Sequence, residues 1–326
     1  MQRKKENDFA KPLISVVVPL WNVEADMRAC VDSILLQSYS RLEVVLVDDG
    51  SPDDCGSIAD TYAKRDSRVR VIHQSNGGLS AARNAGTLAA KGDYITYVDG
   101  DDYLEPGCIE YLWELMRNAN AQLSICQNWK KCTLKHHQRR NLQESLTPEE
   151  AMEAMLYQKK FDTSACGKLY RIDDARAIPF PEGKLYEDLA TVYKRIWQAQ
   201  QIALGSRGLY HYRVRPGSIT RRQFHPQRFD EIEAIEQLER FVKRNCPALA
   251  RAALCRKFSC FCQVYLAMPD DDEVYKDEGQ RLWHFIANAR WAVMTDRRAR
   301  FKNRCAACLA LLGSSPFRAV WAAIAK

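Results

Sequence analysis

The sequence has no apolar run long enough to cross a lipid bilayer. Its first apolar stretch, residues 13–20, is far shorter than the roughly 20 residues that a spanning helix needs. A Gly-x-Gly-x-x-Gly motif is also missing after this stretch, which argues against a nicotinamide-dependent oxidoreductase. No low-complexity tract or internal repeat is present, and 46% of the residues are hydrophobic. The composition therefore indicates a globular chain with one large domain or two.

The 12 cysteines lack the spacing of a structural zinc site. Cys305 and Cys308 form a single CxxC pair, and no second pair stands at a suitable distance from it. The N-terminal residues are charged and are followed by no apolar signal core. We therefore expect reduced thiols in a cytoplasmic protein, most of them small buried residues.

Positive charge is concentrated toward the C-terminal end. The chain has 48 Lys and Arg against 41 Asp and Glu, a net charge of +7. From Arg290 onward, eight Lys or Arg accompany one Asp, so this stretch is as basic as the whole chain. Residues 301–326 mix these charges with Leu, Trp, Ile and Ala. They are expected either to lie on an anionic membrane surface as a pair of interfacial helices or to pack as a helix on the catalytic domain.

Strands and helices alternate through the first part of the chain. Short apolar, β-branched runs predict strands at 13–18, 42–47, 69–73 and 94–98. Apolar residues at helical spacing predict helices at 23–37, 53–65, 79–90, 106–119, 147–157 and 187–200, and Thr147 and Glu150 form a capping box. This alternation predicts an α/β fold with a mostly parallel sheet, flanking helices, and ligands at the carboxyl ends of the strands. Beyond about residue 225 the pattern is almost wholly helical.

Three aspartates crowd the end of the predicted strand at 94–98, namely Asp99, Asp101 and Asp102. Neighbouring carboxylates repel one another unless a cation or a proton relieves them. With no His or Cys beside them, they suit a hard ion, Mg²⁺ or Mn²⁺, held together with substrate phosphates. Asp and Gly also form solvated turns, so the cluster by itself leaves both interpretations open.

Two further motifs follow predicted strands. Asp48 and Asp49 end the strand at 42–47, where a carboxylate can accept hydrogen bonds from a base or a ribose, or can cap a turn. Residues 76–78, Asn-Gly-Gly, open a helix whose N–H groups suit an anion. Arg83 follows one turn later, as a nucleotide or phosphate contact or as a surface charge.

Six motifs in this order make residues 12–225 resemble the family 2 glycosyltransferases with a GT-A fold. The resemblance is strongest to bacterial enzymes that build capsule, exopolysaccharide or lipopolysaccharide chains. The motifs are ISVVVPLWN at 14–22, VDDGS at 47–51, NGGLSAARNAG at 76–86, DGDD at 99–102, CGKLY at 166–170 and YED at 186–188. Trp21 stands where the family usually has Tyr. The QxxRW pattern of processive polymerases is absent, which favours transfer of one sugar per encounter.

The resemblance implies a role for each motif. Asp49 would contact uracil, Asp99 would face the ribose or the donor sugar, and Asp101 would be the metal ligand. Asp102 would assist the metal or bind the sugar. Asp188 would be the general base that removes a proton from the acceptor hydroxyl, with Glu187 beside it. Further contacts to the nucleotide sugar would come from Pro19, Asn22, Asp48, Asn76 and Arg83. By their charge and chemistry, Lys168 and Arg213 are candidate diphosphate contacts and His225 is a candidate third metal ligand, with ordinary surface or core residues as the alternative for all three.

The resemblance thus implies an inverting, metal-dependent hexosyl- or N-acetylhexosaminyltransferase. It would move a sugar from a UDP-sugar to a hydroxyl of a glycan or lipid-linked acceptor, with Mn²⁺ or Mg²⁺. Residues 1–225 would form the catalytic domain, with a nucleotide-sugar half at 12–105 and an acceptor half at 106–225. Residues 226–326 would form a helical, basic module. We expect the whole protein to be cytoplasmic and peripheral at the inner face of a bacterial plasma membrane, with no nucleic-acid partner.

Two alternatives remain open at the level of the sequence. A sugar-phosphate nucleotidyltransferase also combines a sheet, a nucleotide and Mg²⁺, but residues 18–22 do not form its GxGxRxxPxT loop. A non-catalytic nucleotide-sugar-binding protein could share this fold, although the presence of Asp101 and Asp188 argues against it.

Overall fold

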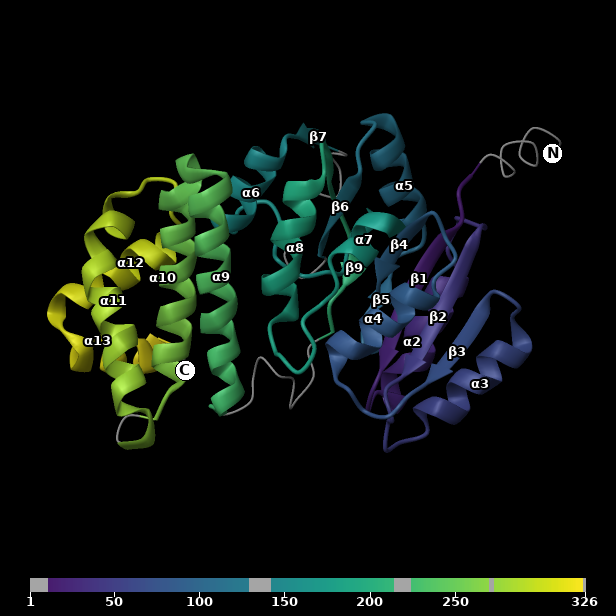
Figure 1. The fold of residues 1–326 in the computed structure, drawn as a ribbon, viewed down its shortest axis with the longest axis horizontal. Coiled ribbons are helices and arrows are strands. Elements are labelled where there is room, and N and C mark those ends of the chain that lie inside the picture. The colour runs from purple at the N-terminus through teal and green to yellow at the C-terminus, as the bar shows by residue number, and fades with distance from the viewer. Residues whose placement is uncertain (1–10, 129–141, 214–223, 270–272, 325–326) are drawn as a thin grey trace. The chain divides into compact units, whose positions relative to one another are not determined.

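Four parallel strands form the first half of a central sheet in the computed structural model, which describes residues 11–128, 142–213, 224–269 and 273–324 (Figure 1). The strands are β1 (Ile14–Leu20), β2 (Leu42–Asp48), β3 (Val69–His73) and β4 (Tyr94–Tyr97), and they lie in the order β3-β2-β1-β4. Register aligns Leu20 with Asp48 and Val17 with Tyr97. β1 and β2 are buried along their whole length, as expected of parallel strands covered on both faces.

The second half of the sheet is mixed. It contains β8 (Lys168–Arg171), β6 (Leu123–Asn128), β9 (Ile202–His211), β5 (Tyr103–Leu104) and β7 (Gln143–Leu146). The order continues β4-β8-β6-β9-β5, with β7 on β9, and β8 runs antiparallel to both of its neighbours. The predicted α/β fold with a mostly parallel sheet is confirmed. The strands of this second half were not predicted from the sequence.

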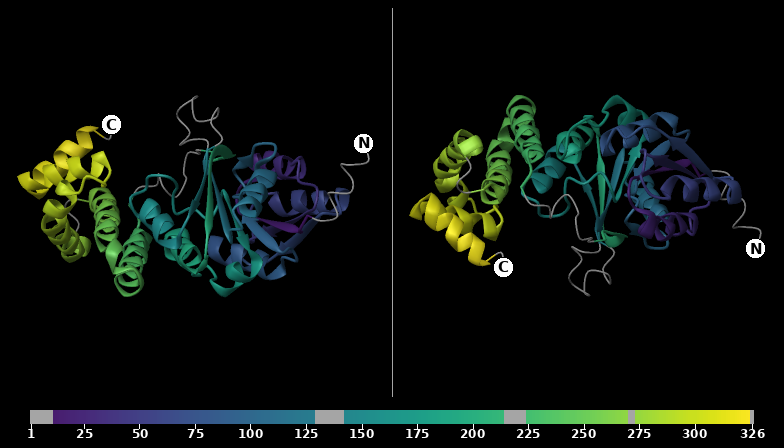
Figure 2. Two further views of the ribbon diagram at one scale, coloured as in Figure 1. Left: turned by 90° about the horizontal axis from the view of Figure 1, so that it is seen from above. Right: turned by 90° about the horizontal axis from the view of Figure 1, so that it is seen from below.

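Helices flank the sheet (Figure 2). They are α2 (Glu24–Leu35), α3 (Cys55–Arg65), α4 (Leu79–Ala89), α5 (Cys108–Asn118) and α7 (Ile172–Ala177). α4 lies close on β1 and β2 because Gly86 has no side chain: a Cβ there would stand 2.3 Å from Val17 Cγ1 and 3.2 Å from Val47 Cγ2. The predicted capping box begins α6 (Pro148–Leu156), since Glu150 N donates to Thr147 Oγ1 and Thr147 N donates to Glu150 Oε2.

The chain divides into two compact units. The first comprises residues 1–151, 163–183 and 191–214 and holds the whole sheet. The second comprises residues 152–162, 184–190 and 215–326. The division passes through α6 and through α8 (Glu187–Gln198). Residues 152–162 and 184–190 thus belong to the second unit although they precede the predicted boundary at 225. That boundary adjoins residues 214–223, which lie outside the described part of the chain.

The second unit is built from helices. α9 (Phe229–Asn245), α10 (Ala250–Ala267), α11 (Lys276–Thr295), α12 (Phe301–Leu309) and α13 (Ser314–Ile324) follow one another, with short 3₁₀ turns between several of them. Phe317 of α13 is fully buried, with its ring 5.6 Å from that of Trp283 and 6.4 Å from that of Tyr265. The inner side of the basic C-terminal stretch is therefore packed against other helices of the second unit; packing on the catalytic domain, one of the two expectations, is not what these contacts show.

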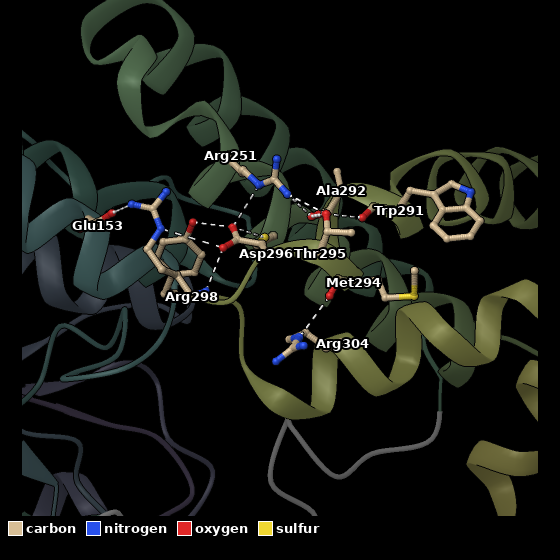
Figure 3. A network of polar contacts seen from close by, with 11 residues as sticks. Glu153, Arg251, Trp291, Ala292, Met294, Thr295, Asp296, Arg298 and Arg304 are labelled. Carbon is tan, nitrogen blue, oxygen red and sulfur yellow. Dashed lines mark hydrogen bonds and ion pairs between the residues drawn. The ribbon is translucent and has the colours of Figure 1, made fainter.

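Asp296 is the centre of a polar network within the second unit (Figure 3). Its Oδ2 accepts a hydrogen bond from Tyr157 Oη at 2.7 Å and lies 3.4 Å from Arg251 Nε. Its Oδ1 accepts from the backbone N of Arg298, whose guanidinium pairs with Glu153 at 2.6 Å. These contacts tie residues 152–162 to the C-terminal helices of the same unit.

Within the described ranges, no helix is both long and apolar enough to span a membrane. None of the eleven cysteines in these ranges forms a disulfide, and nine of them are buried.

Candidate active site

The carboxyl ends of β1, β2 and β4 meet at one edge of the sheet. Leu20 at the end of β1 accepts a hydrogen bond from the backbone N of Asp49 at 3.0 Å. On the other side of β1, a Cβ on Gly100 would stand 2.9 Å from Pro19 O, so the aspartate turn at 99–102 lies directly against this strand end. Two acidic motifs that are far apart in the sequence therefore flank the end of β1.

Pro19 and Asn22 shape the end of β1. Pro19 is buried at a position that β4 no longer pairs, because the β1–β4 register ends at Val17, so its missing N–H leaves no gap in that ladder. Asn22 is exposed and adopts a left-handed conformation with φ of 52°, and its backbone N donates to Ser51 Oγ at 2.7 Å. The loops after β1 and β2 are thereby joined.

Asp48 and Asp49 have different surroundings. Asp48 caps its own turn, since Oδ1 accepts from Ser51 N at 3.0 Å, and its Oδ2 lies 2.9 Å from His73 Nδ1. That contact, followed by the one with Asp60, raises the pKa of His73. Asp48 is thus the turn aspartate that the sequence left unassigned.

Asp49 organises the loop that precedes α4. Its buried carboxylate accepts from Gln74 Nε2 at 2.7 Å, from Gly77 N at 2.9 Å and from Gly78 N at 2.8 Å. These bonds use three of the roughly four acceptor positions of a carboxylate. Asn76, between the bonded residues, is exposed. The sequence predicted that the N–H groups of Gly77 and Gly78 could bind an anion. In the structure both donate hydrogen bonds to the Asp49 carboxylate.

Arg83 joins α4 to the aspartate turn. Its side chain is 1% exposed, and Nη2 donates to Asp99 Oδ1 at 2.7 Å. The guanidinium also lies over the ring of Phe180, 5.3 Å from its centroid. Arg83 is therefore a buried ion-pair partner that positions Asp99, and the alternative of a surface charge is excluded.

Asp102 is held inside the protein by the end of β9. Its Oδ2 accepts from Tyr210 Oη at 2.5 Å and its Oδ1 accepts from Arg213 N at 2.8 Å. The same Tyr210 oxygen accepts from Asp99 N at 3.2 Å. Burial, with the added negative charge of Asp99, raises the pKa of the Asp102 carboxyl to about 8.

Tyr210 is a residue of this site that sequence reasoning missed. Arg213 is a candidate diphosphate contact whose guanidinium pairs with Asp26 and lies 5.4 Å from the centroid of the Tyr103 ring, and its role toward a diphosphate stays a prediction. The sequence signal for Tyr210 was its place in a segment that resembles the end of the family's catalytic domain. No spacing rule connects it with an aspartate 108 positions earlier.

Asp101, the middle aspartate of the turn, is partly exposed, whereas Asp102 is buried. Across the described residues, no group of three or more His, Cys, Asp or Glu is arranged to hold a metal ion. A cation held by one carboxylate together with substrate phosphates needs no such group, and that is how Mg²⁺ usually binds. The residues present therefore fit a metal that arrives with a diphosphate.

The two remaining candidate ligands of the nucleotide or metal have protein contacts of their own. Lys168, at the start of β8 in the first unit, is buried, and its Nζ donates to Ser164 O at 2.5 Å. His225, in the second unit, is exposed and caps a 3₁₀ turn by accepting from Gln227 N through Nδ1. Their roles toward diphosphate and metal stay predictions.

Glu187 and Asp188 form the first turn of α8, within the part of that helix assigned to the second unit. Glu187 is buried and Asp188 is partly exposed. Acidic side chains in a first helical turn interact favourably with the positive end of the helix dipole, so this position by itself does not require a catalytic role.

A mostly parallel α/β sheet with aspartates gathered at its carboxyl edge is the arrangement of a nucleotide-sugar transferase with a GT-A fold. The chain belongs to glycosyl transferase family 2, whose family model matches residues 15–178. It is therefore a glycosyltransferase, and the nucleotidyltransferase alternative is set aside.

Several known proteins are similar to this chain. EpsJ of Bacillus subtilis, an uncharacterized glycosyltransferase, is 35% identical over 230 residues, which cover 68% of this chain and 67% of EpsJ. The glycosyltransferase GlyG of Streptococcus pneumoniae is 36% identical over 223 residues, 65% of this chain and 74% of GlyG. Among solved structures, residues 1–349 of S. aureus TarS in complex with UDP-GlcNAc match with a TM-score of 0.67 at 18% identity, covering 94% of this chain and 90% of that one. This last similarity concerns the fold.

Proposed function

We propose that this glycosyltransferase moves a hexosyl or N-acetylhexosaminyl group from a UDP-sugar to a hydroxyl of a glycan or lipid-linked acceptor in cell-surface polysaccharide biosynthesis. The observation that carries the proposal is the convergence of the Asp48–Asp49 motif and the aspartate turn on either side of the end of β1. Ligands of open α/β sheets bind at the carboxyl ends of such strands. TarS, which has the same fold, is known in complex with UDP-GlcNAc.

In this proposal each aspartate of the turn at 99–102 has a separate role in binding the donor. Asp101 is the protein ligand of Mn²⁺ or Mg²⁺, and Asp99, oriented by Arg83, faces the ribose or the donor sugar. Asp102, fixed by Tyr210 and Arg213, holds the shape of the turn rather than contacting the sugar. The cation, when bound, neutralises the charge that develops on the leaving diphosphate.

Asp188 is the general base of the proposed reaction. Its carboxylate takes the proton of the acceptor hydroxyl while that oxygen forms a bond to the anomeric carbon and the bond from this carbon to the UDP oxygen breaks. One displacement inverts the anomeric configuration. Glu187, which is buried beside it, is the less accessible of the two carboxylates.

We further propose that the second unit contacts an anionic membrane surface on the cytoplasmic side. Phe301 is 78% exposed and Leu312 is 63% exposed, at the two ends of the stretch formed by α12 and the following turn. Exposed Arg297, Arg298 and Lys302 stand beside or within the same stretch. Apolar side chains flanked by cations suit an interface with anionic headgroups.

The proposed reaction is tested with the Asp188→Asn variant. The amide keeps the shape of the side chain but cannot take a proton, so transfer should fall by about 10²–10⁴-fold while Mn²⁺-dependent UDP binding persists. The donor is first chosen by screening UDP-Glc, UDP-Gal, UDP-GlcNAc, UDP-GalNAc and UDP-GlcA. Proton NMR of the wild-type product should show the opposite anomeric configuration to the donor.

Glu187→Gln is the matched control, because it makes the same chemical change one residue away. A product with retained configuration would refute the single displacement. Near-normal turnover of Asp188→Asn, with loss of turnover in Glu187→Gln, would move the base to Glu187.

A further inference from the structure

The segment that leads into α8 holds a conformation that side chains rarely adopt. Tyr186, directly before Glu187 and Asp188, has a φ of 60°, and Gly183 has a φ of 71°. Glycine takes a left-handed conformation without cost, whereas tyrosine does so only where its surroundings impose it. Such strain concentrates at functional sites, so the contacts that impose it are informative.

One set of contacts to this segment comes from the first turn of α9. The backbone N of Leu185 donates to Asp230 Oδ2 at 3.0 Å, and Lys184 Nζ donates to Asp230 Oδ1 at 3.1 Å. Asp230 therefore uses both carboxylate oxygens on two consecutive residues of the segment. The Asp230 side chain is only 13% exposed, whereas that of Lys184 is 45% exposed, so the bond to the backbone of Leu185 is the better candidate for an anchor than the solvent-accessible ion pair.

The hydroxyl of Tyr186 is influenced by charges near Asp230. Burial raises the pKa of this hydroxyl to about 12, and the charges that act on it include Glu231 and Arg228, one and two positions from Asp230 in the chain. On the other side of the segment, Tyr186 O accepts from Ala190 N at 3.2 Å, which starts the hydrogen-bond ladder of α8. The left-handed residue is thus held between α9 and the helix that carries Asp188.

We infer that Asp230 is a positioning residue for the general base. By holding the N–H of Leu185, it sets the left-handed turn at Tyr186 and through it the direction in which the first turn of α8 presents Asp188. All of these residues belong to the second unit. The inference rests on the proposed role of Asp188 and adds to it the element that orients this side chain.

The contacts of Asp230 and Glu233 allow the backbone anchor to be separated from the ion pair. Glu233 Oε2 accepts from the same Lys184 Nζ at 2.8 Å, and no bond from Glu233 to the backbone of the segment accompanies it among the described contacts. Asp230→Ala removes both contacts of Asp230. Asp230→Asn keeps an acceptor oxygen for Leu185 N but removes the charge. Glu233→Gln weakens the ion pair with Lys184 and can keep an acceptor oxygen for Gln237 Nε2, without changing the bond from Leu185 N to Asp230.

The experiment measures kcat and KM for the donor, together with hydrogen exchange of the Leu185 amide, in the three variants. Asp230→Ala should lower kcat by about 10–100-fold, the usual cost of misplacing a catalytic group, with the KM for the donor unchanged. The Leu185 amide should exchange faster in this variant. Asp230→Asn and Glu233→Gln should retain amide protection and most of kcat, which a merely electrostatic or stabilising role of Asp230 would not produce.

Normal kcat in Asp230→Ala, or equal losses in Asp230→Asn and Asp230→Ala, would overturn the inference. Unchanged exchange of the Leu185 amide in Asp230→Ala would overturn it even if that variant loses activity. If Asp188→Asn is inactive and Asp230→Ala is fully active, only the role of Asp230 fails. If Asp188→Asn turns over normally, the proposed base fails and the role of Asp230 fails with it.

Discussion

Neighbouring aspartates in this protein differ in what surrounds them. Asp48 caps a turn, while Asp49, one residue on, accepts three hydrogen bonds from the loop before α4. In the turn after β4, Asp99 pairs with Arg83 and Asp102 is buried against Tyr210. Identical side chains thus acquire different partners and accessibility, and burial raises the pKa of Asp102 among them.

The metal assignment predicts the behaviour of Asp101→Ala. Because the proposed cation bridges this carboxylate and the diphosphate, the variant should lose transfer and should bind UDP about tenfold or more weakly in the presence of Mn²⁺. Isothermal titration with Mn²⁺ and with EDTA measures the effect. The affinity in EDTA, which does not involve the cation, should match that of wild type. Wild-type affinity of the variant in Mn²⁺ would contradict the assignment.

His73 makes the stability of the first unit depend on pH. Its contacts with Asp48 and Asp60 raise its pKa above the ordinary value of 6.5. The ion pairs therefore stabilise the folded state fully below pH 6.5, and this contribution is lost as the pH rises through the raised pKa. The effect is small because half of the His73 side chain is exposed.

An NMR titration of the His73 ring should give a midpoint above 6.5. In urea unfolding, wild type should lose more stability than His73→Gln between pH 6 and pH 8. A midpoint at or below 6.5 would refute the predicted ion pairs.

At the scale of elements, α4 is fitted to the sheet through Gly86. Alanine is the better helix former by about 1 kcal/mol, but its Cβ would lie 2.3 Å from Val17 in a fully buried strand. Overpacking of this kind costs about 1–3 kcal/mol, so Gly86→Ala should destabilise the protein. Denaturant unfolding measures the change.

Gly279→Ala is the matched control, since its Cβ would meet only Met268 Cε at 3.7 Å, an ordinary contact. That helical substitution should be neutral or stabilising, by up to about 1 kcal/mol. Equal effects of the two substitutions would show that close packing of α4 on β1 does not limit stability.

At the scale of the whole molecule, the basic C-terminal stretch has a packed side and an exposed side. Phe317 is buried in the second unit, so deleting residues 301–326 would damage that unit as well as any membrane contact. The double variant Phe301→Ser and Leu312→Ser removes exposed apolar surface alone. It should sediment less with anionic vesicles than wild type does, and 1 M salt should weaken wild-type binding because it screens the cations.

Leu88→Ser is the control for that measurement, because Leu88 is a 73% exposed leucine on α4 in the first unit. This variant should bind vesicles as wild type does. Undiminished binding of the Phe301 and Leu312 double variant would argue against the proposed membrane surface.

Much of the nucleotide-sugar half was predictable because its elements are local. The strands at β1 to β4 and helices α2 to α5 lie within a few residues of their predicted bounds, since buried parallel strands and amphipathic helices have distinct periods. β6, β8 and β9 were not predicted. β9 contains Gly205, Arg207 and Gly208, which weaken a strand pattern, and its pairing with β6, β5 and β7 supplies the stability that its own sequence lacks.

By itself, the sequence determined the fold class, the family, and the strand ends at which acidic residues gather. Only the tertiary structure decided which of those residues face inward, because that depends on partners far along the chain. Asp102 meets Tyr210 across 108 positions, and Leu185 meets Asp230 across 45. The spacing of apolar residues along the sequence indicates which face of a helix or strand is buried. A hydrogen bond between residues far apart in the sequence forms only when folding brings their elements together.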